Sequence, residues 1–439
     1  MSGVYARACQ NLVASVSDDL KAAQGWESST RVPPAEDPSN PLDSAGNRKP
    51  KMRQNEPCTF LYASIGPRLL CFLVDIASGT LTEQGETILP NNVQYAWPHA
   101  NGRYFYVASG ENRVGSSNNY VTAFRVDPGS GQLAKLGEDV ELPQRPVHIT
   151  TDADSQHLLV AFNNPSGMRI YRIEDDFRIG SEVVQDIEID AGIFAHQVRV
   201  SPDNRNVILV TRGNKATDLK PEDPGALMVF KYQNGRLSDQ NRIAPNNGYG
   251  FGVRHLDFHP NGRWIYVALE LQNKLQCFTL EDQAVSPRPF AERFTVSDPE
   301  NAPLRQIPGA IHMHPNGKYV YVSNRADGTM EWQGQSVFAG GENTIAVFAL
   351  DEHTGTPSLH QLADTRKIHP RTFHIDPSGT LMVVQHNMPR MVRQDGELKQ
   401  VSAGLTVFRI KDDGTLKHLR EYDFDVSDAL MWWCGMITL

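Results

Sequence analysis

A hairpin-like segment that recurs along the chain is the feature that most restricts its fold. The copy VRHLDFHPNGRWIYVALE, residues 253–270, places apolar runs on both sides of a turn that contains Gly262. Related segments surround turns at Gly102, Ser155, Asn204, Gly317 and Gly379, so the turns are 49 to 62 residues apart. Self-similarity at such a spacing is typical of repeat architectures in which each repeat is one supersecondary unit.

A second recurring pattern accompanies the hairpins. It is an alternating strand followed by an acidic or glycine-rich turn, as in YVTAFRVDPGSGQL and KLQCFTLEDQ, and it occurs seven times against six complete hairpins. The additional copy follows TFLYASIG, residues 59–66, which supplies a second strand without a first. The chain thus begins partway through a unit, and the C-terminal DALMWWCGMITL can provide the missing strand.

Four short strands per unit in seven units predict an all-β fold, a seven-bladed β-propeller of four-stranded antiparallel blades over residues 58–439. Strands from both ends of the chain would close the ring, which removes the sheet edge that favours aggregation. Two packed sandwiches are the alternative, although they would not explain a unit repeated in fixed register. We expect residues 1–57 to be an extension, with a short amphipathic helix over 5–23 and a linker or disordered segment after it.

Composition and charge exclude several classes of function. A net charge of -9 argues against broad binding to nucleic acid or to anionic membranes. No apolar run reaches the ~18 residues of a membrane span, and the N-terminus is a poor signal-peptide core. The five cysteines never form a C-x-x-C pair, so neither a disulfide framework nor a zinc site is indicated. We therefore expect a cytoplasmic protein without a cofactor.

Comparison of the hairpins at fixed offsets, that is, at the same number of residues before or after each turn, locates a candidate site. The start of the first strand and the end of the second lie side by side in an antiparallel hairpin, and first strands line the central channel of a propeller. Eight residues before the turns are Gln94, Val147, His196, Arg254, Gly309 and Arg371, and eight residues after them are Gly110, Asn163, Arg212, Glu270, Arg325 and Asn387. These positions predict a polar, net cationic channel mouth.

Histidines occur at two further kinds of position. His99, His259 and His314 precede the turn in three units, and we interpret them as structural because a repeated residue beside a turn readily satisfies local backbone groups. His255 is one residue out of register with Arg254, so we expect it to point to the other face of the strand. Residues that differ between units at one offset are better functional candidates.

Three segments carry a resemblance to a known family. VRHLDFHPNGRWIYVALEL, GAIHMHPNGKYVYVSNR and PRTFHIDPSGTLMVV resemble the seven-bladed lactonase family, which includes a bacterial 6-phosphogluconolactonase and the fungal carboxy-cis,cis-muconate cyclase; the similarity runs from about residue 60 to 424. The resemblance implies a metal-independent site at one channel mouth. Its acting residues are matched here by His196, Arg254, Glu270 and Arg325, the four that the offsets also favour.

Group chemistry suggests how these residues would act. A histidine suits proton transfer near neutral pH, so we expect His196 to be the general base that activates water against a lactone carbonyl. Glu270 would orient the imidazole or a guanidinium, while Arg254 and Arg325 bind the substrate's carboxylate or phosphate and stabilise the oxyanion. The expected partner is a small anionic lactone or a polycarboxylate. Further substrate-binding candidates are Arg371, Arg212, His386 and Asn387.

Alternatives to a metal-independent lactonase stay open at this level. A carboxymuconate-type cycloisomerase would need nearly the same residues, and many propellers are non-catalytic binding scaffolds. A divalent metal could bind at Glu270, Asn163 and Asn387, although the arginine-rich ring makes a cation unattractive there.

Departures from the family pattern concern the rim of the predicted mouth. Leu269 stands where the family usually has an asparagine beside the glutamate. Residues 326–342 and 388–403 are insertions after second strands, and 212–224 is also long. These loops are either ordinary surface insertions or a lid that carries Trp332, Phe338, Met388 and Met391.

Overall fold

The computed structural model describes residues 57–111, 117–303 and 305–439. The predicted helix over 5–23 and the linker up to residue 56 lie outside the described residues. No helix among the described residues has the length and apolar character needed to cross a membrane.

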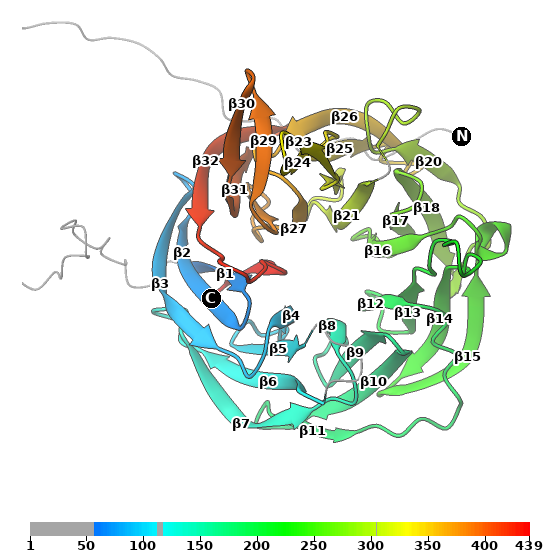
Figure 1. Cartoon of the computed structure of the whole chain (residues 1–439). Helices are drawn as coiled ribbons and strands as arrows, with labels where there is room; N and C mark the ends of the chain where they lie inside the picture. The colour runs from blue at the N-terminus through cyan, green and yellow to red at the C-terminus, as the bar shows by residue number, and fades with distance from the viewer. Residues whose placement is uncertain (1–56, 112–116, 304) are drawn as a thin grey trace, which may run out of the picture. The chain divides into compact units, whose positions relative to one another are not determined.

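Seven four-stranded antiparallel sheets form the propeller, which confirms the predicted fold (Figure 1). The innermost strands of blades one to seven are β33 (Cys434–Thr438), β4 (Val93–Pro98), β8 (Pro146–Thr151), β12 (Ala195–Val200), β16 (Val253–Phe258), β21 (Gln306–Met313) and β27 (Pro370–Ile375). The second strands are β1 (Thr59–Ile65), β5 (Tyr104–Gly110), β9 (His157–Asn163), β13 (Asn206–Thr211), β17 (Trp264–Leu269), β22 (Tyr319–Ala326) and β28 (Leu381–His386).

The outer half of each blade contains two further strands. The third strands are β2 (Arg68–Asp75), β6 (Asn119–Val126), β10 (Ser166–Ile173), β14 (Ala226–Gln233), β18 (Lys274–Glu281), β25 (Thr344–Leu350) and β31 (Ala403–Ile410). The outermost strands are β3 (Thr80–Ile88), β7 (Leu133–Glu141), β11 (Ile179–Glu182), β15 (Arg236–Ile243), β26 (Pro357–Asp364) and β32 (Leu416–Phe424), and blade five divides this strand into β19 (Ala284–Val285) and β20 (Ala291–Phe294). A 3₁₀ turn, η1, spans Pro245–Gly248.

The first blade is closed by strands from both ends of the propeller. β33 pairs antiparallel with β1 from Thr59 opposite Thr438 to Ala63 opposite Cys434. Cys58 and Leu439 extend this ladder with two backbone hydrogen bonds of 3.0 and 2.9 Å. The prediction that the C-terminal segment supplies the missing inner strand is therefore confirmed.

The hydrophobic core is divided among the interfaces between neighbouring blades. Each of seven buried clusters joins two adjacent blades, including the pair formed by blades seven and one. Between blades four and five, for example, Ile208, Leu256 and Ile265 are fully buried. Both faces of each sheet are buried here, because each sheet packs against a neighbouring sheet on either side.

The turn histidines connect neighbouring blades, as their repetition suggested. In His259, Nδ1 accepts a hydrogen bond from the backbone of Asn261 and Nε2 lies 2.8 Å from the carbonyl oxygen of Gly317 in the next blade. His314 makes the corresponding contact with Gly379 in blade seven. A Cβ atom at Gly379 would lie 2.5 Å from the His314 ring, and its φ is +74°, so both space and backbone require glycine. The structural interpretation of His259 and His314 is confirmed.

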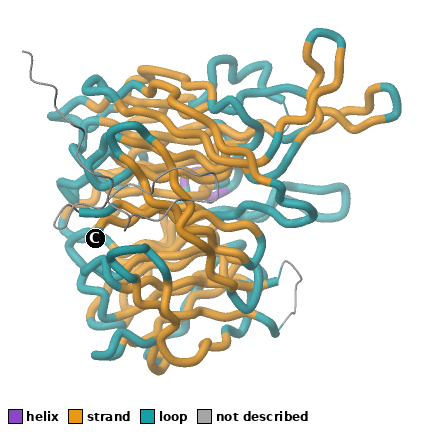
Figure 2. Tube along the Cα trace, turned by 90° about the vertical axis from the view of Figure 1, so that its left-hand side faces the viewer, coloured by secondary structure: helices purple, strands orange, loops and turns teal. Residues whose placement is uncertain are grey.

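Two insertions form hairpins of their own. Residues 326–342 contain β23 (Thr329–Trp332) and β24 (Gln335–Phe338), and residues 388–403 contain β29 (Arg390–Gln394) and β30 (Glu397–Val401). The Arg393 guanidinium lies 5.3 Å from the centroid of a Trp332 ring, which joins the two hairpins. Figure 2 shows strand hairpins extending beyond one end of the propeller.

Candidate active site

A β-bulge near the start of six inner strands determines which side chains reach the candidate site. The pairing of each inner strand with its neighbour shifts register at this point, for example between Val253 and His255 in β16. The unpaired residues are those found eight residues before the turns: Gln94, Val147, His196, Arg254, Gly309 with Ala310, and Arg371. A bulge frees one residue from the ladder and redirects its side chain, so these positions can vary without disturbing the strand.

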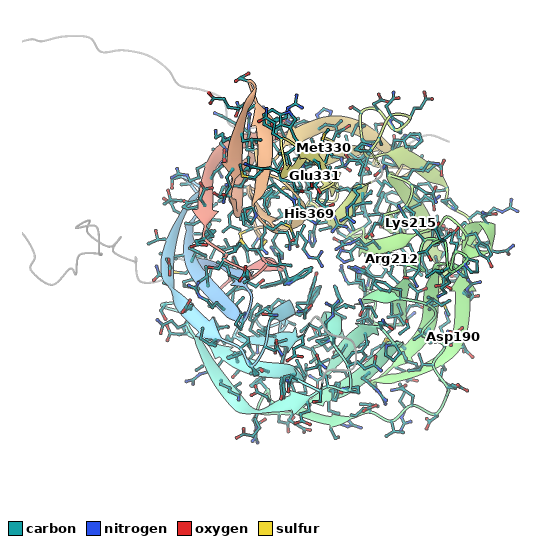
Figure 3. All side chains as sticks on the ribbon, in the orientation of Figure 1. Asp190, Arg212, Lys215, Met330, Glu331 and His369 are labelled. Carbon is teal, nitrogen blue, oxygen red and sulfur yellow. The ribbon has the colours of Figure 1, made fainter. Side chains whose placement is uncertain are left out.

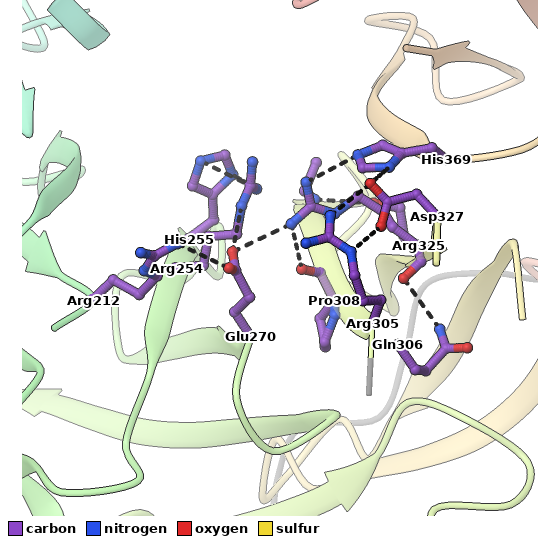
Figure 4. A network of polar contacts seen from close by, with 12 residues as sticks. Arg212, Arg254, His255, Glu270, Arg305, Gln306, Pro308, Arg325, Asp327 and His369 are labelled. Atoms are coloured by element: carbon purple, nitrogen blue, oxygen red, sulfur yellow. Dashed lines mark hydrogen bonds and ion pairs between the residues drawn. The ribbon is translucent and has the colours of Figure 1, made fainter. Parts of the chain in front are cut away.

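Glu270 is the centre of the polar network at this end of the propeller (Figure 4). Its Oε2 lies 3.1 Å from Nε of Arg254 and 3.2 Å from Nη2 of Arg325, and its Oε1 lies 3.0 Å from Nη1 of Arg212. Arg254 and Arg325 are 2% and 3% exposed. One buried carboxylate thus holds three guanidinium groups that come from three consecutive blades.

The charges in this network shift one another's protonation. Burial raises the pKa of Glu270, but Arg325, Arg212 and Arg254 together outweigh burial and hold that pKa below its usual value. The Glu270 carboxylate therefore stays ionised near neutral pH and is a weak base. The structure places it to orient guanidinium groups, which is one of the two roles expected for it.

A pocket of about 380 Å³ opens above this network. Its charged lining consists of two carboxylates, Glu270 and Asp327, and six arginines: Arg145, Arg212, Arg254, Arg305, Arg325 and Arg371. The excess of guanidinium groups suits an anionic ligand. Figure 3 shows Arg212 on the inner side of the ring of blades, whereas Asp190 lies at its outer side.

His196 lines the pocket, as expected from the offsets, but no carboxylate of the described residues contacts it. Its ring centroid lies 5.0 Å from that of His255, and its Nδ1 has no hydrogen-bond partner among the described residues. Burial, and then Arg254 and Arg212, hold the pKa of His196 well below its usual value. The imidazole is therefore neutral, and Glu270 does not orient it.

The four further substrate-binding candidates have different environments. Arg371, Arg212 and Asn387 all line the pocket. The Arg371 guanidinium lies 3.9 Å from the centroid of a Trp432 ring, a cation–π contact. His386 is fully buried at the end of β28 outside the pocket lining, and its Nδ1 lies 3.4 Å from the carbonyl oxygen of Gly404. The structure therefore does not bring His386 to the site, because the last residue of β28 is paired with β31.

The expected orientation of His255 is wrong. Nη1 of Arg254 lies 3.2 Å from Nδ1 of His255, so the two side chains lie against each other. The expectation rested on strict alternation along the strand, and the bulge in β16 breaks that alternation.

Four charged or titratable pocket residues were missed by the offset comparison: Arg145, Arg305, Asp327 and His369. His369 and Asp327 each lie two residues away from an offset position, and Arg305 precedes β21. Nδ1 of His369 lies 3.1 Å from Oδ2 of Asp327, and Arg305 contacts both oxygens of the same carboxylate at 2.6 and 2.7 Å. Their position in the flanking loops rather than in the strands hid them, although the His-Pro-Arg sequence at the start of β27 marks an unusual strand entry.

The alternative metal ligands Glu270, Asn163 and Asn387 all line the pocket, but their surroundings do not fit a divalent cation. Both oxygens of Glu270 are engaged by arginines. Nδ2 of Asn387 donates a hydrogen bond of 2.8 Å to the carbonyl oxygen of Met431. A cation bound at Glu270 would have to displace guanidinium groups and would be repelled by them.

The inserted hairpins contribute to the pocket only through their bases. Of the four apolar residues considered for a lid, Met388 lines the pocket, whereas Trp332, Phe338 and Met391 do not. Asp327 and Arg212, at the bases of the other two long loops, also line it. In this structure the insertions therefore form part of the pocket wall and do not cover it.

Comparison with known proteins agrees with this architecture. Residues 63–425 match the model of the family described as "Lactonase, 7-bladed beta-propeller". Similar solved structures include the periplasmic gluconolactonase of Pseudomonas aeruginosa, 19% identical with a TM-score of 0.65 over 87% of this chain and 99% of that one. A protein of Bacteroides uniformis, provisionally named a 6-phosphogluconolactonase, is 20% identical with a TM-score of 0.64 over 87% and 100% of the two chains. The chain belongs to the lactonase family of seven-bladed β-propellers.

Proposed function

We propose that the protein is a lactone hydrolase that acts, without a metal ion, on a lactone of an anionic sugar or carboxylic acid in the pocket around Glu270. The observation that carries the proposal is the pocket's charge: six arginines face two carboxylates, and three of the arginines are held by one buried glutamate. Membership of the lactonase family supports the reaction class. The cytoplasmic location expected from the sequence belongs to the same proposal.

Each charged group has a role in this proposal. Arg254 and Arg325 bind the substrate's carboxylate or phosphate and stabilise the oxyanion that forms when water attacks the carbonyl carbon. Glu270 holds their guanidinium groups in place, which lowers the cost of ordering them on binding. Arg371, Arg212 and Asn387 complete the binding surface. Proton transfer near neutral pH suits an imidazole, and the described lining offers two, His196 and His369.

Acid release in a pH-stat tests the proposal with 6-phosphogluconolactone, an uncharged gluconolactone and a carboxylated muconolactone as substrates. We expect hydrolysis of an anionic lactone that continues after EDTA treatment. Replacement of Arg254 by Gln should lower kcat/KM about 10²–10³-fold, as for removal of an oxyanion donor. Arg263→Gln is the matched control, because Arg263 lies in the turn of the same hairpin and its side chain is 66% exposed.

Other results would redirect the proposal. Turnover of a carboxymuconate, followed by its ultraviolet absorbance, without lactone hydrolysis would identify a cycloisomerase instead. Activity lost with EDTA and restored by a divalent metal would refute metal independence. Absence of any turnover, with anion binding equal in wild type and Arg254→Gln, would favour a non-catalytic scaffold.

A further inference from the structure

The pocket contains a second imidazole whose backbone is held in an uncommon conformation. His369 precedes Pro370, the first residue of β27, and its φ is +59°. Its N–H donates a hydrogen bond of 2.8 Å to Oδ1 of Asn343, and its carbonyl oxygen accepts one of 3.2 Å from the N–H of Asn387. A non-glycine residue persists in this left-handed region only where its surroundings enforce it, and such residues cluster at functional sites.

The His369 imidazole contacts a carboxylate, which an arginine binds in turn. Nδ1 of His369 lies 3.1 Å from Oδ2 of Asp327, within ion-pair range although the N–H is not aligned as in an ideal hydrogen bond. Arg305 fixes Asp327 through both carboxylate oxygens. Burial raises the pKa of Asp327, but His369 and Arg305 outweigh burial and hold that pKa well below its usual value. Asp327 is thus ionised and can orient the imidazole, and catalytic contacts often align only when substrate is bound.

The other imidazole has none of these features. His196 lies among arginines and next to Phe194 and His255, and no carboxylate of the described residues contacts it. A proton on His196 would be repelled by Arg254 and Arg212, whereas a proton on His369 would be stabilised by Asp327. Nε2 of His369 also lies 3.5 Å from Nη1 of Arg325, one of the groups proposed to bind the substrate. The imidazole thus lies next to a group that, in the proposed function, binds the substrate.

We propose that His369 is the general base of the reaction and that Asp327 and Arg305 are its positioning residues; this inference rests on the proposed lactonase function. Nε2 takes a proton from water as the water oxygen bonds to the carbonyl carbon, and Nδ1–H turns toward Asp327. The ring C–O bond then breaks, its electron pair goes to the ring oxygen, and the imidazolium returns the proton there. The product is a hydroxy acid whose carboxyl group ionises to solvent.

The pH dependence expected for this base follows from its neighbours. Burial lowers the pKa of His369 to about 4; Asp327 opposes this shift, and Arg325 and Arg371 add to it. His386 and Lys367 are the other titratable groups nearby, and His386 is affected by both His369 and Lys367. Removal of the Asp327 charge should lower the pKa of His369 further. The acid limb of kcat/KM should then move to lower pH, while the plateau falls because the base is weaker.

Two variants and a control test the proposal. His369→Asn removes the imidazole but keeps a residue that tolerates a positive φ, and it should lower kcat/KM by about 10²–10⁴-fold. Asp327→Asn should lower kcat/KM at least tenfold and move the acid limb to lower pH. His374→Gln is the control, because His374 is a half-buried histidine in β27, the strand that follows His369, and lies outside the pocket lining; it should keep both rate and profile.

The outcomes separate this inference from the proposed function. Should the wild type hydrolyse none of the lactones, the proposed function fails and the base assignment fails with it. If the wild type is active but a folded His369→Asn stays within threefold of it, only the base assignment is wrong, and a parallel loss in His196→Gln would transfer the role to His196. Where His369→Asn does not fold, Asp327→Asn decides: a shifted acid limb supports the assignment and an unshifted one overturns it.

Discussion

The Glu270 carboxylate allows a stability prediction whose magnitude follows from the structure. Glu270→Gln keeps the size of the side chain but removes the charge that faces Arg254, Arg325 and Arg212. Two of these guanidinium groups are almost fully buried, and breaking a buried ion pair by removing one partner costs about 3–5 kcal/mol. The variant should therefore be clearly less stable, although none of its contacts lies in a hydrophobic core.

The expected change in melting temperature follows from the size of the propeller, Pro57–Leu439. An unfolding entropy of about 2.1 cal/mol/K per residue sums to roughly 0.8 kcal/mol/K, so the loss corresponds to roughly 4–6 °C. Differential scanning calorimetry at pH 7.5 measures it. Citrate, a polyanion, should raise the melting temperature of the variant more than that of the wild type, because the unpaired guanidinium groups gain a counter-charge.

A matched control is available in the same blade. Glu292 in β20 pairs with Lys274 at 2.8 Å, but these side chains are 48% and 21% exposed and so reach solvent, and Glu292→Gln should cost at most about 1 kcal/mol. A Glu270→Gln variant that melts no lower than Glu292→Gln would refute the argument that Glu270 compensates buried positive charge. Equal citrate stabilisation of variant and wild type would contradict it as well.

Three further predictions test the bulges, the turns and the buried histidines. Gly309→Ala should lower kcat/KM at least tenfold, because the added Cβ would lie 2.3 Å from Oγ of Ser323 and 3.0 Å from Cδ of Arg325, and would displace the Arg325 side chain. Gly167→Ala is the control and should leave kcat/KM unchanged, because its Cβ would make only an ordinary contact. His259→Ala should cost about 1–2 kcal/mol in urea unfolding through lost hydrogen bonds yet leave kcat unchanged, whereas the exposed His353→Ala should leave both unchanged. Histidines whose pKa is lower in the folded than in the unfolded protein should destabilise it at acid pH, because the unfolded chain then binds more protons. The free energy of unfolding should be highest above pH 6.5 and should fall toward pH 4 by up to about 1.4 kcal/mol per pH unit for each such histidine. The histidines concerned are His369, whose pKa burial lowers to about 4, and His374 and His386, whose pKa values burial lowers to about 3. A melting temperature that is constant between pH 7 and 5 would contradict this prediction.

The repeat in the sequence was enough to predict the fold. A hairpin depends on the alternation of apolar and polar residues and on a turn, all within about twenty residues, so each blade is encoded locally. The second pattern occurs once more often than the complete hairpin, and this difference revealed the unit that β33 completes. The offset comparison also found most of the charged pocket residues, because equivalent positions in a repeat occupy equivalent places around the axis. Glu270, Arg254, Arg325 and Arg212 meet for this reason.

Tertiary structure decided the details of contact. The bulges turn Arg254 and His255 to lie against each other, which no pattern of alternation predicts. Packing of blade seven against blade six brings the loop residue Asp327 against His369. Sequence therefore determined which residues surround the axis, because that follows from local periodicity. Which side chains pair there depends on loops and bulges, whose geometry is established only when all seven blades are packed together.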